Sequence, residues 1–275
     1  EELLTELKKE FKYWYPLNLR VSGKDLIKNH LIMCLYNHAF IWKNKDMLPK
    51  GFAVNGYTTL NKSQMSKSTG NFITLIDAVE KYCADATRIA LALGTDTLDD
   101  ANFDEVNAYE AVVFLSNEKD LIEDLLKNYP TESKDDDDEN VWDVIFTNKV
   151  DNGVNDITDS IENMMFRKAF VDIYGLVSAK DTYKNIYKNK MDSIPSKFYR
   201  ICFEYVEKFV NVMEPFCPFW TESVRQMIKS YGKDIEHSWP VKKEINTKYM
   251  WLDDSFNTLL GVINKKYTKI TKKVK

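Results

Sequence analysis

Residues 61–72 read Asn61-Lys62-Ser63-Gln64-Met65-Ser66-Lys67-Ser68-Thr69-Gly70-Asn71-Phe72, a run rich in small hydroxyl side chains. Such a composition favours a loop over a packed element. Successive backbone N–H groups and mobile ammonium groups are well suited to bind phosphate oxygens. Thr74 is a plausible N-cap for a following helix, whose N-terminus adds partial positive charge. From composition alone, a flexible surface loop remains the simpler interpretation.

The neighbouring stretch 56–63 is one residue away from a phosphate-binding P-loop. Asn61 stands where the second glycine of that motif is required, and the tight turn around the phosphates depends on that glycine. We therefore reject the P-loop interpretation.

The bulk composition indicates a globular protein of one large or two ordinary domains, with 275 residues, 44% hydrophobic residues and 29% charged residues. The net charge of −4 means that any contact with RNA must use a local patch. The four cysteines are far apart and form no Cys-x-x-Cys pair, so we expect free thiols and no zinc site. No apolar run is long enough to span a membrane. Because the chain opens inside an acidic amphipathic helix and without methionine, we expect a piece of a longer protein.

The first hundred residues alternate strand and helix patterns. A helix is predicted over 1–14 and ends at Pro16, a strand over 17–21 follows, and helical spacing returns from Leu26 to Trp42. Strand, turn and helix form half of a doubly wound sheet, which binds ligands at the carboxyl ends of its strands. Gly23 and Asp25 lie at such an end and are suited to a ribose, although a turn with a capping aspartate explains them equally simply.

The next segment predicts a tight hairpin over 52–60 with Asn55-Gly56 as its turn. Helices are expected over 74–82 and 85–93, the second capped by Asp85 and closed by Gly94. The acidic turn at 99–103 is interpreted as helix capping rather than as a metal site.

From about residue 104 the pattern is helical almost throughout. A helix reaches about residue 126, and further helices are expected at about 141–163, 165–189, 195–212, 219–231 and 250–267. The acidic run within 131–140 predicts a solvated loop. The tail over 262–275 carries six lysines and no acid, which is either a frayed end or a contact with RNA backbone.

The order of residues in the opening stretch carries a family resemblance. Met65-Ser66-Lys67-Ser68 resembles the Lys-Met-Ser-Lys-Ser signature of class I aminoacyl-tRNA synthetases, with Gln64 in place of the first lysine. The flanking residues 68–72 are similar to the cytosolic type of leucyl-tRNA synthetase. The departure at Gln64 puts one phosphate contact in doubt.

Further segments resemble the same family. Residues 19–31 look like the segment between its editing insertion and the signature loop, and 100–103 match its Asp-Ala-Asn-Phe run. The turn at 214–220 resembles its Pro-x-Cys-Pro-His turn, with Phe219 where histidine is usual, and 238–240 match its tryptophan-proline. By this resemblance Gly23 and Asp25 contact the ATP ribose, and His30 lines the amino-acid pocket.

The resemblance implies an α/β part followed by an all-α part. Residues 1–97 correspond to the second half of a Rossmann-like catalytic core with the signature loop, and 98–275 to an antiparallel helix bundle of the anticodon-binding type. It implies ATP-dependent activation of leucine and its transfer to tRNA(Leu) in the cytoplasm, with Mg²⁺ brought by ATP and no membrane contact. A multi-synthetase complex is a further kind of partner that the family allows.

The residues expected to act on ATP all come from the quoted stretch and the end of the first strand. Lys67, Ser66 and Ser68 are the expected catalytic residues, and Gly23, Asp25, Met65 and Lys67 the expected ATP contacts. A valyl or isoleucyl enzyme is one alternative, and a tRNA-binding module without catalysis is another. No His-Ile-Gly-His sequence is present, so the chain on its own is expected to be inactive.

Overall fold

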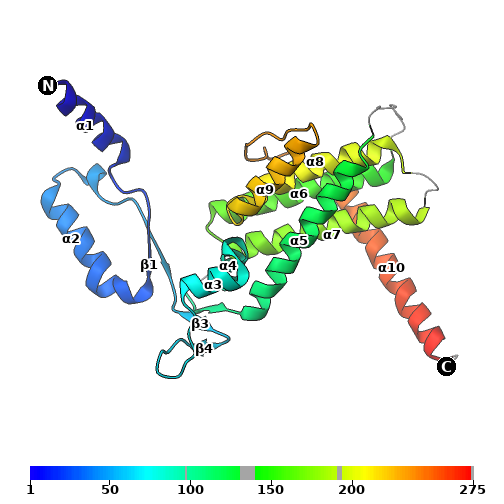
Figure 1. Ribbon diagram of the computed structural model, residues 1–275, viewed down its shortest axis with the longest axis horizontal. Helices are drawn as coiled ribbons and strands as arrows, with labels where there is room; N and C mark the ends of the chain where they lie inside the picture. Colours follow the sequence, from blue (N-terminus) through cyan, green and yellow to red (C-terminus); the bar gives the residue numbers. More distant parts are fainter. Residues whose placement is uncertain (97, 131–139, 191–193, 274–275) are drawn as a thin grey trace. The chain divides into compact units, whose positions relative to one another are not determined.

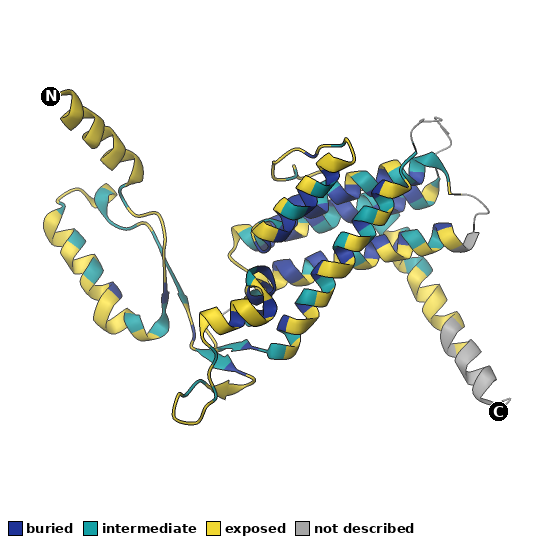
Figure 2. Ribbon diagram, in the orientation of Figure 1, coloured by how far each residue is buried: buried dark blue, intermediate teal, exposed yellow. Residues whose placement is uncertain are grey.

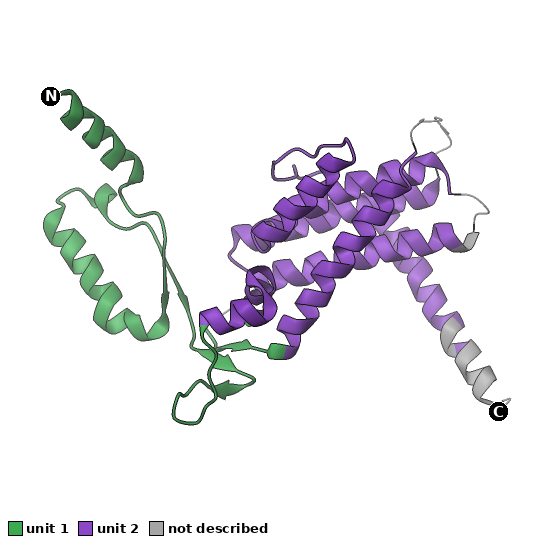
Figure 3. Ribbon diagram, viewed as in Figure 1, with its two compact units in different colours: residues 1–74, 94–105 green, residues 75–93, 106–275 purple. Residues whose placement is uncertain are grey.

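The computed structural model describes residues 1–96, 98–130, 140–190 and 194–273. It divides into two compact units, which Figure 3 colours separately. Unit 1 comprises 1–74 and 94–105, and unit 2 comprises 75–93 and 106–275. Residues 75–93 therefore pack with the helices of unit 2, whereas the predicted domain boundary near residue 97 stays a prediction.

Unit 1 holds every strand of the described residues, together with short helices (Figure 1). Its elements are α1 (Glu2–Trp14), β1 (Arg20–Gly23), η1 (Lys24–Leu26), η2 (Ile27–Leu31), α2 (Ile32–Ile41), η3 (Lys45–Met47), β2 (Phe52–Asn55), β3 (Thr58–Leu60), β4 (Ser63–Gln64) and β5 (Ala101–Phe103). The predicted strand at 17–21 begins three residues later than expected, because Arg20 is the first residue that pairs with β2.

Two small sheets organise unit 1. β1 and β2 are parallel, with Arg20 opposite Phe52 and Gly23 opposite Asn55. In the second sheet β3 lies between β4, which is antiparallel to it, and β5, which is parallel. The predicted hairpin over 52–60 is therefore wrong. β2 and β3 do not pair with each other, because each finds a parallel partner far away in the sequence, and Gly56 separates them.

Gly56 is where the backbone of two distant segments meets. A Cβ atom at this position would lie 2.2 Å from the carbonyl oxygen of Asp99 and 2.8 Å from the Cα atom of Asp100. Only glycine allows this approach. The Asn55-Gly56 pair thus marks a close contact between segments and not a hairpin turn.

Most apolar residues of α1 and α2, the two long helices of unit 1, are exposed, and Figure 2 draws much of both helices in yellow, the colour of exposed residues. None of the residues of α1, all of which the structure describes, is buried. Leu3 in α1 is 68% exposed, and Phe40 in α2 is 92% exposed. Parallel sheets are normally covered on both faces, so the small β1–β2 sheet has little of the core that such a sheet needs.

Every regular element among the described residues of unit 2 is a helix. Its helices are α3 (Leu75–Tyr82), α4 (Ala84–Ala92), α5 (Glu105–Lys127), α6 (Val141–Glu162), α7 (Phe166–Lys190), α8 (Ser196–Met213), α9 (Pro218–Ser230) and α10 (Thr247–Lys273). The predicted helices of this part are confirmed, because long amphipathic segments define a buried face clearly. The predicted acidic loop at 131–140 lies, except for Asn140, outside the described residues.

The core of unit 2 is aromatic. Tyr183 and Tyr187 of α7 are both nearly inaccessible to solvent, and their hydroxyl groups donate to the same carboxylate oxygen of Asp143, at 2.8 and 2.5 Å. The ring of Tyr183 stacks on Phe146 with centroids 4.2 Å apart. Together these contacts fasten α7 to α6, the pair of helices with the most extensive contact in the unit.

Asp85 does not cap its own helix. Its side chain is 3% exposed and accepts a hydrogen bond from the backbone N–H of Trp220, in the first turn of α9. The N-cap residue of α4 is Cys83, whose side chain makes no capping hydrogen bond. The prediction that Asp85 caps the helix at 85–93 is therefore wrong, because a donor in the distant α9 takes up its carboxylate.

Candidate functional site

The first group of predicted site residues lies where β1 ends. Gly23 is the last residue of β1 and has extended backbone, and exposed Asp25 lies two residues further on, in η1. A Cβ atom on Gly23 would lie 2.6 Å from Oδ1 of Asp25. The missing side chain therefore leaves room for this carboxylate. Gly23 and its partner Asn55 lie at the same edge of the parallel pair, which is the edge where sheets of this kind bind ligands.

His30 lies in η2, a single turn of π-helix where the sequence predicts a continuous α-helix. Its ring is exposed, and Nε2 lies 3.4 Å from Nη2 of Arg20 in β1. Turns of this kind are rare and occur often at functional sites. The imidazole thus contacts the guanidinium of the residue that begins β1, whereas Gly23 ends this strand.

Asp100 ties the end of β1 to the segment before β5. Its Oδ1 lies 2.6 Å from Nζ of Lys24 and accepts a hydrogen bond from the backbone N–H of Tyr57 at 2.9 Å. The hydrogen bond with Lys24 lowers the pKa of Asp100 and raises the pKa of Lys24. The predicted role of 99–103 in helix capping is therefore wrong for Asp100, whose carboxylate joins two strand ends.

The second group of predicted site residues is carried by the hairpin β3–β4. Its two turn residues, Asn61 and Lys62, have φ angles of 49° and 66°, as in the turns that match the twist of a hairpin. The side-chain oxygen of Asn102 in β5 accepts a hydrogen bond from the backbone N–H of Lys62 at 2.5 Å. The side chain of Asn61 in turn bonds to Glu105, at 2.9 Å from its amide nitrogen. The stem of the loop is thus fastened on both sides.

The loop itself closes on its own backbone. The N–H of Ser66 donates to the carbonyl of Asn71 at 2.9 Å, and the Oγ atoms of Ser66 and Ser68 lie 2.9 Å apart. Gly70 has a φ of +73°, a left-handed conformation that glycine adopts at little cost. The predicted loop is confirmed, and it is a closed turn with defined hydrogen bonds.

Lys67 lies at the tip of this loop with its side chain exposed. Within the part of the chain that the structure describes, no carboxylate forms an ion pair with it. Met65 and Ser66 are half-buried and precede it. An exposed ammonium group on a small closed loop is available for an anion that approaches from solvent.

Most of the predicted residues form two groups: Gly23 lies with Asp25 at the end of β1, and Met65, Ser66, Lys67 and Ser68 lie in the loop. His30 instead contacts Arg20, the first residue of β1. Figure 1 shows the loop after β4 well apart from α2. Among the described residues, no hydrogen bond or ion pair joins Ser66, Lys67 or Ser68 to the group around Gly23. Sequence reasoning missed the anchoring role of Asn102. The one feature of the sequence that pointed to this role was the position of an asparagine within the run 100–103.

The described residues contain neither a cluster suited to a metal ion nor a helix suited to a membrane. In that part of the chain no three or more His, Cys, Asp or Glu side chains are grouped so that they could hold a metal ion. None of the described helices has a stretch both long and apolar enough to cross a membrane.

Comparison with known families divides the chain within its helical part, between α5 and α6. Residues 2–128 match the family "tRNA synthetases class I (M)", and residues 143–275 match the family "Anticodon-binding domain of tRNA ligase". Between them the two families account for nearly the whole chain.

Known proteins with similar sequences are leucine–tRNA ligases. The chain is 34% identical over 244 residues to the cytoplasmic leucine–tRNA ligase of Pongo abelii, an alignment that covers 88% of this chain and 20% of the relative. It is 52% identical over 124 residues to the cytoplasmic leucine–tRNA ligase of Saccharomyces cerevisiae, covering 45% of this chain and 11% of the relative. The chain thus spans about a fifth of the length of the relatives that it matches along most of its own length.

Solved structures with a similar fold belong to the same class. The LeuRS of Agrobacterium radiobacter K84 agnB2, in a ternary complex with tRNA and LeuAMS, superposes with a TM-score of 0.63 at 18% identity, covering 84% of this chain and 29% of that one. The methionyl-tRNA synthetase of Mycobacterium tuberculosis, in complex with methionyl-adenylate, gives a TM-score of 0.61 at 17% identity, covering 85% and 50%. The predicted order of an α/β part and a helix bundle is confirmed by this likeness.

Proposed function

We propose that this chain is the part of a leucine–tRNA ligase, a class I tRNA synthetase, that carries the signature loop and the tRNA-binding helix bundle. The observation that carries the proposal is the closed loop at 65–72 on its fastened hairpin. It presents the ammonium group of Lys67, which forms no ion pair with the residues that the structure describes. Similarity to cytoplasmic leucine–tRNA ligases along most of the chain supports leucine as the amino acid.

The proposed reaction has two steps. The carboxylate of leucine attacks the α-phosphate of ATP, which gives leucyl-adenylate and releases pyrophosphate. A ribose hydroxyl at the end of tRNA(Leu) then attacks the leucyl carbonyl, which gives leucyl-tRNA and releases AMP. Reactions at phosphate of this kind depend mainly on positioning and on stabilisation of charge. We propose that Mg²⁺ arrives with the triphosphate of ATP.

Different residues of this chain have different proposed roles in the formation of leucyl-adenylate. Lys67 neutralises the charge that grows on the departing pyrophosphate, and Ser66 and Ser68 offer hydroxyl and backbone N–H groups to the same oxygens. Gly23 and Asp25 hold the ATP ribose, because the carboxylate accepts from its hydroxyls and the glycine leaves space beside it. Met65 packs against the nucleotide, and His30 lines the pocket for leucine.

The helical unit contributes the contact with tRNA. Its match to an anticodon-binding domain and its likeness to a synthetase bound to tRNA support this role. The basic tail at 262–275 is the proposed contact with the RNA backbone, although nearly all of its lysine side chains lie outside the described residues. Because the relatives are named cytoplasmic, we propose the cytoplasm as the place of action.

Amino-acid-dependent ATP–pyrophosphate exchange by the complete protein tests the proposal. Leucine should support exchange, and valine and isoleucine should support far less. Faster exchange with valine or isoleucine would assign the chain to one of those enzymes instead. Complete protein that binds tRNA but exchanges with none of the three would be a binding module.

A further inference from the structure

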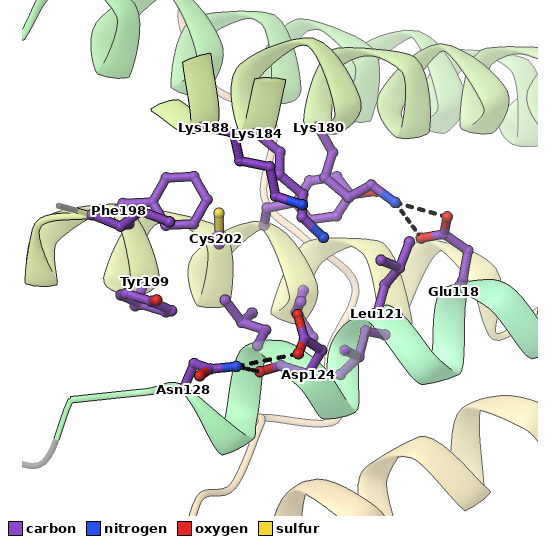
Figure 4. A pocket seen from close by; sticks show the side chains of 15 residues that line it. Glu118, Leu121, Asp124, Asn128, Lys180, Lys184, Lys188, Phe198, Tyr199 and Cys202 are labelled. Atoms are coloured by element: carbon purple, nitrogen blue, oxygen red, sulfur yellow. Dashed lines mark hydrogen bonds and ion pairs between the residues drawn. The ribbon is translucent and has the colours of Figure 1, made fainter. Parts of the chain in front are cut away.

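A pocket of about 270 Å³ lies in unit 2 between α5, α7 and α8 (Figure 4). Its volume is close to the lower end of the roughly 300–1,000 Å³ of small-molecule sites. Apolar side chains form most of its wall, including Leu121, Ile122, Leu125, Phe198 and Val206. None of the residues of the candidate site in unit 1 lines it.

Three lysines of α7 line one side of this pocket. Lys180, Lys184 and Lys188 recur every four residues and therefore share one face of the helix. Nζ of Lys180 bonds to both carboxylate oxygens of Glu118 at 2.7 Å, which neutralises this lysine. Burial nevertheless raises the pKa of Glu118 above its ordinary value, against the opposing effect of Lys180.

Lys184 and Lys188 have no such partner. Figure 4 shows both side chains reaching from α7 into the space toward α5. Among the residues that the structure describes, neither forms an ion pair. The remaining carboxylate of the pocket, Asp124, accepts a hydrogen bond from the side-chain amide of Asn128 at 3.2 Å. The side chains that line the pocket thus include three lysines and two carboxylates beside an apolar wall, and a third carboxylate, Asp181, pairs with Lys180 at 3.4 Å from outside the lining. Lys184 and Lys188 are the two ammonium groups left for a ligand.

The hydroxyl of Tyr205 lies behind the wall of the pocket. Tyr205 lines the pocket and is 3% exposed. Its hydroxyl is fully buried, and no atom of the described residues forms a hydrogen bond with it. An atom that is closed to water is equally closed to a molecule in the pocket, so Tyr205 contributes to the wall through the rest of its side chain.

We propose that this pocket binds a small amphiphilic carboxylate. Its aromatic or aliphatic body lies against the apolar wall, and its carboxylate is held by Lys184 and Lys188. The enclosed apolar wall favours a small molecule over RNA, because a nucleic-acid strand needs a basic groove that follows its backbone. The site is separate from the residues proposed to act on ATP.

Calorimetric titration of the complete protein with hydroxynaphthoate, and with its neutral amide as a matched ligand, tests the proposal. Hydroxynaphthoate should bind at least about tenfold more tightly than the amide, because only the anion gains charge-assisted hydrogen bonds. Lys184→Gln/Lys188→Gln should weaken binding of the anion by about 10- to 100-fold and leave the amide unchanged. The control Lys229→Gln/Lys248→Gln removes the same charge outside the pocket and should change neither affinity.

Tyr205→Phe is a further control in the pocket wall. It should leave the affinity for hydroxynaphthoate unchanged, because the hydroxyl is buried out of reach of the ligand, and it should not lower the melting temperature, because the hydroxyl has no hydrogen-bond partner among the described residues. Absence of saturable binding would overturn the proposal, as would equal affinity for acid and amide or an equal effect of the control pair. The proposal also fails if tRNA displaces the probe and the Lys184/Lys188 variant weakens tRNA binding instead, since the lysines would then serve RNA.

Discussion

The carboxylate of Asp85 in α4 accepts a hydrogen bond from the backbone N–H of Trp220 in α9, at 2.5 Å, although 135 residues separate the two. Trp220 lies in the first turn of its helix, where N–H groups have no partner within the helix. The N-cap residue Cys217 supplies no side-chain hydrogen bond. Asp85 therefore caps a helix that is remote in sequence and fastens the segment 75–93 into unit 2.

Removing this carboxylate should destabilise unit 2. Asp85→Ala should lower the free energy of unfolding by about 1–3 kcal/mol, because it leaves a buried N–H group unpaired. Asp85→Asn keeps an acceptor oxygen and should cost much less. Chemical denaturation followed by circular dichroism measures both, with exposed Asp254→Asn as control. A loss no larger than that of the control would mean that the cap contributes nothing.

Ionisation of Asp85 should make the stability of unit 2 depend on pH. Burial raises the pKa of Asp85, although backbone N–H groups of α9 oppose the shift. The pKa of Asp85 is therefore higher in the folded than in the unfolded state. The contribution of protonated Asp85 to the free energy of unfolding is then fully present below about pH 3.9, and it is lost as the pH rises through the folded-state pKa. Asp85→Asn cannot ionise. Its stability relative to the wild type should therefore increase as the pH rises from about 4 to 7, and a constant difference would contradict the shift.

The sequence predicts the helices of unit 2 well and the sheets of unit 1 poorly, for one physical reason. Helical periodicity is local, so the predicted and observed ends of α6 and α8 agree within one residue. Parallel pairing of β1 with β2, and of β3 with β5, joins segments that no local pattern connects. Asn55-Gly56 predicts a hairpin turn, but Gly56 is needed because the backbone of Asp99 and Asp100 approaches it closely. The loop at 65–72 was found through a family signature, whereas its anchor Asn102 was not.

Gly56 should not tolerate any side chain. In Gly56→Ala the new Cβ atom would meet backbone atoms of Asp99 and Asp100, which cannot rotate away. We expect unit 1 to lose about 1–3 kcal/mol of stability. Gly51→Ala is the matched control, because the nearest atom to its Cβ would lie at an ordinary 3.5 Å. Hydrogen exchange of peptides from unit 1 distinguishes the two variants, and equal exchange rates would show that the contact at Gly56 is loose.

Asn102 should act on catalysis as a positioning residue. Asn102→Ala removes the acceptor for the N–H of Lys62 in the turn and frees the stem of the loop. Adenylate formation should slow by about 10- to 100-fold, because small displacements of a catalytic group are costly. Asn102→Asp keeps an oxygen at the same position and should recover most of the rate. If the aspartate variant is as slow as the alanine variant, hydrogen bonding to the turn is not what matters.

The basic tail should determine how tRNA binding responds to salt. Each phosphate contact contributes about 0.9 to the slope of log K against log salt concentration. Deletion of residues 262–275 should therefore flatten the slope by the number of contacts that its lysines make. Filter binding of tRNA(Leu) to the complete protein over a range of salt concentrations measures this. An unchanged slope would identify the tail as a solubilising end.

Lys67 is the residue on which the proposed chemistry depends most. Its exposed side chain on a small loop can meet the phosphates of ATP when pyrophosphate begins to leave, and such a contact is stronger in the transition state than in the ground state. Lys67→Ala should slow adenylate formation by about 10²–10³-fold and leave the affinity for leucine nearly unchanged. Lys62→Ala removes the same charge at the hairpin turn and should cost much less, since its backbone N–H still bonds to Asn102. Pre-steady-state measurement of adenylate formation for the two variants side by side decides the matter, because equal and mild effects would reduce the loop to a surface turn.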